Sequence, residues 1–132
     1  KVDYSICLEG SLKLKEISYI HSEAYQAGEL KHGTISLIND GTPVIAIVTD
    51  PDIKEKTNSN IEEVKSRGAF TIVITNEETT VGDYQIITPK VSEYFQPILV
   101  VPTLQLIAYE VAKLRGCDID KPKNLAKSVT VE

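Results

Sequence analysis

The feature that most constrains the fold is a continuous run of apolar, mostly β-branched residues at positions 44–48, VIAIV. A strand covered on one face alternates apolar and polar residues, whereas a strand covered on both faces is apolar throughout. Residues 70–74 (FTIVI) form a second run of this kind, and residues 84–87 (YQII) form a third, shorter one. These runs predict a parallel sheet whose strands are buried between layers of helices.

Segments with the composition of helices alternate with these strands. Residues 3–20 read as a first helix, and a second is expected to start at an Asp50 cap and to stop before Gly68. Residues 92–115 read as a long apolar helix that its two prolines could break. Between the first helix and the first strand, a short helix ended by Gly28 is expected.

This alternation predicts a single α/β domain, a three-layer α-β-α sandwich with a parallel sheet and helices on both faces. Ligands of such sheets bind beyond the carboxyl ends of the strands. Residues 49–50 and 75–76 occupy those ends in the predicted sheet. They are therefore one place to look for a binding site.

Composition excludes several classes of function. The 132 residues carry a net charge of −5, and no two Lys or Arg residues are adjacent, which argues against nucleic acid or an anionic membrane as partner. No apolar run approaches the roughly 20 residues of a membrane span. Cys7 and Cys117 lack a CxxC spacing and are expected to be free thiols in a cytoplasmic protein. A chain without an initiator Met is expected to be a fragment of a longer chain.

No cofactor or metal site is expected. There is no glycine-rich phosphate-binding fingerprint after a strand, and the turn that follows residues 44–48 is acidic. His21 and His32 belong to no spacing that is typical of metal ligands. These patterns predict neither a nucleotide cofactor nor a metal ion.

Three ionisable side chains on the first predicted helix form what we call the charged row: Glu9, Lys13 and Glu16. At 100° per residue they share one sector with apolar neighbours, which predicts that they face the protein interior. The face expected to be solvated carries Ser11, Lys15 and Ser18. Two interpretations stay open: a structural ion-pair network, or the wall of a polar pocket in which the lysine keeps one carboxylate ionised as a base.

Two other regions have alternative interpretations. His32 is suited either to packing at the start of a helix or to proton transfer near neutral pH. The last residues, NLAKSVTVE, could be a solvated terminus that carries Lys127, but their apolar residues predict that this tail docks.

Two stretches resemble a known family. LEGSLKLKEISYIHSEAYQAGELKHG and GCDIDKPKNLAKSVTVE are similar to the C-terminal part of glutamine–fructose-6-phosphate aminotransferases, also called glucosamine-6-phosphate synthases. The resemblance covers the whole chain, residues 1–132, and implies the second of two sugar-isomerase (SIS) subdomains, with a flavodoxin-like fold. It implies an enzyme that makes glucosamine 6-phosphate from fructose 6-phosphate and glutamine. Residues 117–132 match a C-terminal tail that closes over the sugar.

The resemblance implies roles for the charged row. Glu16 matches the general base that moves a proton between C1 and C2 of the sugar. Lys13 matches the lysine beside that base, and Glu9 matches an acidic neighbour expected to bind substrate. A carboxylate that reaches two adjacent carbons suffices for an aldose–ketose shift, and a nearby ammonium stabilises developing enolate charge.

Three further residues receive roles from the resemblance alone. His32 matches a histidine that assists opening of the sugar ring and is donated across a dimer to the other subunit's site. Lys127 matches the tail lysine that contacts the open-chain sugar and has been proposed to form a Schiff base with it. Ala126 matches a backbone contact to the substrate in the same tail.

The implied partners are fructose 6-phosphate and glucosamine 6-phosphate, the other SIS subdomain and the glutaminase domain of the same chain, and a second copy in a homodimer. The isolated chain is expected to be inactive, because sugar-phosphate anchoring and ammonia supply belong to other domains. Two alternatives stay open: a stand-alone SIS isomerase or deglycase, and a sugar-phosphate-sensing dimerisation module.

Overall fold

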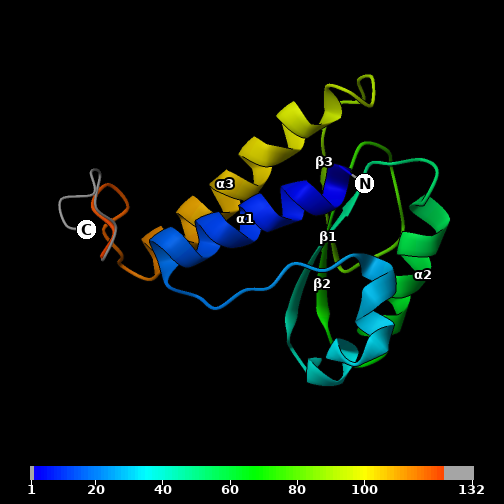
Figure 1. Cartoon of the computed structure of the whole chain (residues 1–132), viewed down its shortest axis with the longest axis horizontal. Coiled ribbons are helices and arrows are strands. Elements are labelled where there is room, and N and C mark those ends of the chain that lie inside the picture. The colour runs from blue at the N-terminus through cyan, green and yellow to red at the C-terminus, as the bar shows by residue number, and fades with distance from the viewer. Residues whose placement is uncertain (1, 124–132) are drawn as a thin grey trace, which may run out of the picture.

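Three parallel strands form the centre of the structure, a computed structural model that describes residues 2–123 (Figure 1). In chain order the elements are α1 (Val2–Ser18), the 3-10 helices η1 (Ala27–His32) and η2 (Thr34–Leu37), β1 (Pro43–Val48), α2 (Lys54–Lys65), β2 (Phe70–Thr75), β3 (Tyr84–Ile87) and α3 (Gln96–Leu114). The strand order is β1-β2-β3, with Val48 opposite Thr75 and Ile72 opposite Tyr84. The three predicted strands are confirmed to within one residue at either end.

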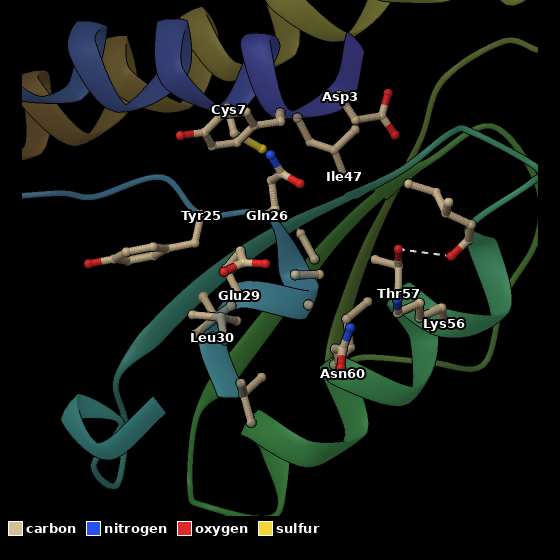
Figure 2. Close-up of a pocket in the computed structure, with 18 of the residues that line it drawn as sticks. Asp3, Cys7, Tyr25, Gln26, Glu29, Leu30, Ile47, Lys56, Thr57 and Asn60 are labelled. Atoms are coloured by element: carbon tan, nitrogen blue, oxygen red, sulfur yellow. Dashed lines mark hydrogen bonds between the residues drawn. The ribbon is translucent and has the colours of Figure 1, made fainter. Parts of the chain in front are cut away.

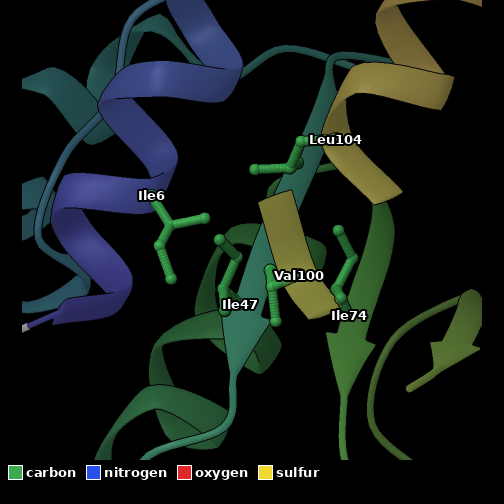
Figure 3. Packing of buried hydrophobic residues seen from close by; sticks show 5 residues of the cluster. All are labelled: Ile6, Ile47, Ile74, Val100 and Leu104. Carbon is green, nitrogen blue, oxygen red and sulfur yellow. The ribbon is translucent and has the colours of Figure 1, made fainter. Parts of the chain in front are cut away.

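Helices cover both faces of the sheet, as predicted. Ile47 of β1 and Ile74 of β2 point toward α1 and α3, where they pack with Ile6, Val100 and Leu104 (Figure 3). The alternate strand residues point the other way. Val48 and Val73 pack against Ile61 of α2, and a second cluster under η1 and η2 joins Ile35, Val64 and Ala69. The three-layer α-β-α sandwich is therefore confirmed.

The helices α1 and α3 pack closely along one another (Figure 1). A Cβ added to Gly10 of α1 would lie 2.7 Å from Cδ1 and 3.2 Å from Cβ of Leu104, so a larger residue here would force the Leu104 side chain or the two helices to shift. The helix α3 continues through Pro102, whose ring is on the exposed side. A break at Pro102 is therefore absent, whereas near Pro97 the predicted helix is interrupted: α3 starts at Gln96, with Pro97 in its first turn, and not at residue 92.

Two predicted helix boundaries are also wrong. The helix α2 starts at Lys54 and not after Asp50; residues 51–53 form a turn in which Asp50 Oδ1 accepts a hydrogen bond from the amide of Asp52. Residues 19–26 form no helix, and Gly28 lies inside η1 rather than at the end of an earlier helix. Residues 51–53 form a turn and residues 19–26 have no regular secondary structure, where the sequence pattern had assigned helix.

One described helix, α3, is long and apolar enough to cross a membrane by length and composition, with 19 residues and a mean hydropathy of 1.4 over an 18-residue window. This corrects the expectation that no such run exists. The same test is passed by helices in the cores of folded domains, and α3 packs on the sheet through Val100 and Leu104. Its outer side leaves Ile98 and Leu106 more than 60% exposed.

Candidate functional site

The structure brings the charged row together on α1. Lys13 Nζ lies 2.8 Å from Glu16 Oε2 and 3.7 Å from Glu9 Oε1. The side chains of Lys13, Glu9 and Glu16 are 34%, 39% and 26% exposed. The row is therefore a connected ion-pair cluster, but it is open on one side rather than enclosed.

The prediction that the charged row faces the interior is wrong for the described residues. Of the face expected to be solvated, Lys15 is exposed as predicted, but Ser11 and Ser18 are 9% and 0% exposed. The leucines beside the row, Leu8 and Leu12, are 47% and 43% exposed. Burial of serine is tolerated because its hydroxyl finds partners: Ser11 Oγ donates to the carbonyl of Ser22, and Ser18 Oγ donates to the carbonyl of Leu14. The row and its leucines thus form an open mixed surface.

Electrostatics within the row favour a charged lysine. The hydrogen bond from Lys13 to Glu16, together with the negative charge of both carboxylates, raises the pKa of the Lys13 ammonium. One ammonium is shared by two carboxylates, so the row keeps a net charge of about −1. A carboxylate in such a cluster can accept a proton from a bound molecule while the ammonium stabilises an adjacent negative charge.

His32 lies apart from the charged row. It ends η1, which packs on the α2 side of the sheet, whereas α1 lies on the other side (Figure 1). The ion pair between Lys31 and Glu63 of α2, at 2.8 Å, fixes this end of η1. The imidazole is exposed, and its expected service to a second subunit stays a prediction.

Lys127 and Ala126 lie outside the described residues, so their expected roles stay predictions. The described part of the tail begins at Cys117, whose Sγ lies 3.9 Å from the carbonyl oxygen of Ser18 at the end of α1. The backbone amide of Lys123 donates to the phenol oxygen of Tyr19 at 2.6 Å. The sequence analysis did not identify Tyr19 as a functional residue. The feature that could have drawn attention to it is its position just after a helix, where a glycine is usual and a bulky residue is not.

The carboxyl ends of the strands hold polar groups, as predicted, but these groups bind one another. Asp3 accepts hydrogen bonds from the amide and hydroxyl of Thr49, and Asn76 Nδ2 donates to the carbonyl of Thr49 and to Gln96 Oε1. Gln96 in turn donates to Thr88 Oγ1. The cluster ties α1 and α3 to the sheet and is a structural network.

A second charged cluster, which we call the strand-end triad, joins Lys54, Glu77 and Lys90. Lys54 Nζ lies 2.5 Å from Glu77 Oε2, and Lys90 bonds to Glu77 Oε1. Hydrogen bonds from both lysines lower the pKa of the Glu77 carboxyl to about 2. Both oxygens of this carboxylate are occupied by cations, so it is poorly suited to take a proton.

A cavity of about 250 Å³ lies between α1, η1, α2 and β1 (Figure 2). Four consecutive β1 residues, 44–47, line it, so it follows the edge of β1 that no other strand covers within residues 2–123. Burial, with Asp3 nearby, raises the pKa of the Cys7 thiol at its wall to about 11. The cavity does not include the charged row.

No group of three His, Cys, Asp or Glu side chains between residues 2 and 123 is arranged to hold a metal ion. Cys7 and Cys117 are both free thiols. The charged row itself offers a carboxylate and an ammonium as chemical groups.

Comparison with known proteins identifies a matching family and similar sequences. The family model of the SIS domain matches residues 2–115. A glutamine–fructose-6-phosphate aminotransferase (isomerizing) of Halalkalibacterium halodurans is 53% identical over 130 residues, and one of Clostridium tetani is 56% identical over 135 residues. These alignments cover 98% and 99% of this chain but 22% of each relative. The chain thus spans about a fifth of the length of the curated relatives it matches.

Solved structures agree in fold. The C-terminal domain of a glucosamine-fructose-6-phosphate aminotransferase from Francisella tularensis superposes with a TM-score of 0.84 at 39% identity, covering 89% of this chain and 34% of that one. A glucosamine-6-phosphate deaminase from Thermotoga maritima superposes with a TM-score of 0.77 at 29% identity, covering 96% of this chain and 37% of that one.

Proposed function

The chain belongs to the SIS domain family, and on this premise we propose that it forms the C-terminal isomerase subdomain of a glutamine–fructose-6-phosphate aminotransferase. The observation that carries the proposal is identity of 53% and more over nearly the whole chain to aminotransferases of that name. The assembled charged row supports it, because the proposed chemistry needs a carboxylate beside a fixed ammonium.

In this proposal the charged row performs the isomerisation. Ammonia released from glutamine condenses with the C2 carbonyl of fructose 6-phosphate, with loss of water. Glu16 then takes a proton from C1 and returns one to C2, while O1 gives up its proton and the imine nitrogen gains one, which converts the ketose imine into the 2-amino aldose. Lys13 stabilises the negative charge that develops between these steps, and Glu9 helps to bind the sugar.

The remaining proposed roles need other parts of the assembly. His32 assists ring opening in the site of a second subunit, which would account for its position away from the charged row. Lys127 and Ala126 contact the open-chain sugar as the tail, residues 117–132, closes over it and excludes water. No metal or organic cofactor takes part, and the proposed location is the cytoplasm.

The proposed partners are further domains of the same chain. An apolar strand at the edge of a sheet is a place where further polypeptide adds, and the open edge of β1 with its cavity fits this. The open surface of the charged row, with Leu8 and Leu12, would face the other SIS subdomain or a second subunit. The glutaminase domain would supply ammonia.

The test is to measure glucosamine 6-phosphate formed from fructose 6-phosphate and glutamine. The full-length protein that contains this chain should form it, and residues 1–132 alone should not, because they lack phosphate anchoring and ammonia supply. Absence of product from the full-length protein, with all substrates present, would refute the proposal. Product formed by residues 1–132 alone would refute the claim that other domains must anchor the phosphate and supply the ammonia.

A second candidate is a glutamine-independent deglycase or isomerase, which the likeness to the Thermotoga maritima deaminase favours. Such an enzyme would release ammonia and fructose 6-phosphate from glucosamine 6-phosphate. Rapid deamination by the full-length protein together with no use of glutamine would support this candidate. A sugar-phosphate-sensing module would bind the sugar and catalyse neither reaction.

A further inference from the structure

The end of α1 has an unusual backbone conformation. Tyr19 follows the last helical residue with a φ of +58°, and it is the one non-glycine residue between positions 2 and 123 with a positive φ. Its amide still donates to the carbonyl of Lys15, so it occupies the place at which a helix normally ends on glycine. A bulky side chain is disfavoured in this conformation, which indicates that something else holds Tyr19 there.

The phenol of Tyr19 holds the start of the tail. Its oxygen accepts a hydrogen bond from the amide of Lys123 at 2.6 Å, across 104 residues of sequence. The neighbouring Ser18 carbonyl lies 3.9 Å from Sγ of Cys117. Asp118 Oδ1 accepts from the amides of Asp120 and Lys121 at 3.1 and 2.9 Å, which folds this segment into a turn. The tail thus leaves α3 and meets the end of α1 at two points.

We propose that Tyr19 is a positioning residue that sets where the C-terminal tail leaves the fold. The tether joins Tyr19, which follows α1 and lies three positions after Glu16, to Lys123, which lies four positions before Lys127. This inference rests on the proposed function, in which both residues act on one sugar. A fixed starting point reduces the number of conformations from which the tail must close, which lowers the entropic cost of closure.

Two substitutions separate the tether from a role in ending the helix. Tyr19→Phe keeps the ring and the backbone conformation and removes only the acceptor oxygen. Tyr19→Gly removes the acceptor and also relieves the disfavoured backbone conformation. If Tyr19 served only to end α1, the phenylalanine variant would behave as the wild type. Tyr84, which is 62% exposed on β3, offers a matched control in Tyr84→Phe.

The first measurement is residue-resolved amide hydrogen exchange on the full-length protein, which needs no assumption about catalysis. In Tyr19→Phe the Lys123 amide should exchange about fivefold faster, the change expected from losing one neutral hydrogen bond. The Lys121 amide, bonded to Asp118, is an internal reference and should not change. Unchanged exchange at Lys123 would overturn the tether.

The second measurement is kinetic. Tyr19→Phe and Tyr19→Gly should each raise the KM for fructose 6-phosphate about fivefold and leave glutamine hydrolysis unchanged, while Tyr84→Phe changes neither. The glycine variant should show this loss without a lower melting temperature. Faster exchange with unchanged KM would overturn the role in tail closure. A wild-type protein that forms no glucosamine 6-phosphate would refute the proposed function but would leave the exchange result standing.

Discussion

The charged row and the strand-end triad contain the same residue types in opposite ratios. In the row one lysine, Lys13, forms ion pairs with two carboxylates, whereas in the triad two lysines form ion pairs with the single carboxylate of Glu77. The side chains of Glu16 and Glu77 are 26% and 38% exposed, so burial alone does not separate them. What differs is the number of cations for each carboxylate.

This ratio decides what each cluster can do. Glu77 has a cation on each oxygen, and its proton affinity is low. The charged row keeps one carboxylate charge in excess of its cation, so a proton can be taken without breaking every ion pair. The comparison therefore supports the proposal that the row carries the chemistry, whereas the triad stabilises the fold.

The largest expected effect tests that assignment. Glu16→Gln in the full-length protein should lower formation of glucosamine 6-phosphate by roughly 10²- to 10⁴-fold, because the base is gone, while glutamine hydrolysis continues. Glu77→Gln is the matched control and should keep synthase activity. Equal activity of the Glu16→Gln variant and the wild type would show that the row is structural, like the triad.

The next effect concerns which face of α1 is covered. Ser18 is 0% exposed, and Ser18→Leu should lower the free energy of unfolding by about 2 kcal/mol, since the added atoms overfill a packed site. Lys15→Leu, on an exposed position of the same helix, should change it by less than about 0.5 kcal/mol. Urea unfolding monitored by circular dichroism measures the free energy of unfolding of both variants. A Ser18→Leu protein as stable as the wild type would contradict the placement of the charged row on the open side of α1.

A smaller effect is expected from acid. Because the pKa of Glu77 is lowered from 4.5 to about 2, its ion pairs stabilise the fold fully above about pH 4.5. That contribution is lost as the pH falls from about 4.5 to 2. Glu77→Gln should therefore flatten the decline of stability in this window.

Asp83 provides the comparison for that experiment. Hydrogen bonds from the amide and hydroxyl of Thr71 and from Lys65 lower the pKa of Asp83 from 3.8 to about 2. It should contribute to the same acid window, so Asp83→Asn should flatten the decline as well. Melting temperatures measured from pH 2 to pH 6 test both variants. A steeper acid decline in either variant would contradict the direction of its shift.

The smallest effect concerns Lys13. Exposed pairs at i,i+3 and i,i+4 contribute about 0.3 kcal/mol each, so Lys13→Met should lower stability by less than about 1 kcal/mol. The raised pKa of Lys13 places this contribution below about pH 10.5, and it should fade as the pH rises beyond that value. The contribution of the Lys13 ion pairs is measured by comparing the melting temperatures of the wild type and Lys13→Met at increasing salt concentration. A loss of several kcal/mol would mean that the row is a buried structural network.

The sequence predicted the sheet well because its strands are continuous apolar runs. Such runs at residues 44–48 and 70–74 can satisfy burial on both faces only inside a layered α/β fold, and the structure places them there. Helix boundaries were less predictable. Asp50 has the properties of a helix cap and accepts from the amide of Asp52, yet residues 51–53 form a turn and α2 starts at Lys54.

Sequence alone determined that Glu9, Lys13 and Glu16 would meet, because helical spacing places residues three and four apart side by side. Only the tertiary structure decided which face of α1 is covered. That choice depends on contacts outside the helix: Leu104 of α3 approaches Gly10, and the carbonyl of Ser22 accepts a hydrogen bond from the buried Ser11 hydroxyl. The contact between Tyr19 and Lys123 was decided in the same way. Helical periodicity specifies which side chains share a face, and long-range packing specifies what that face meets.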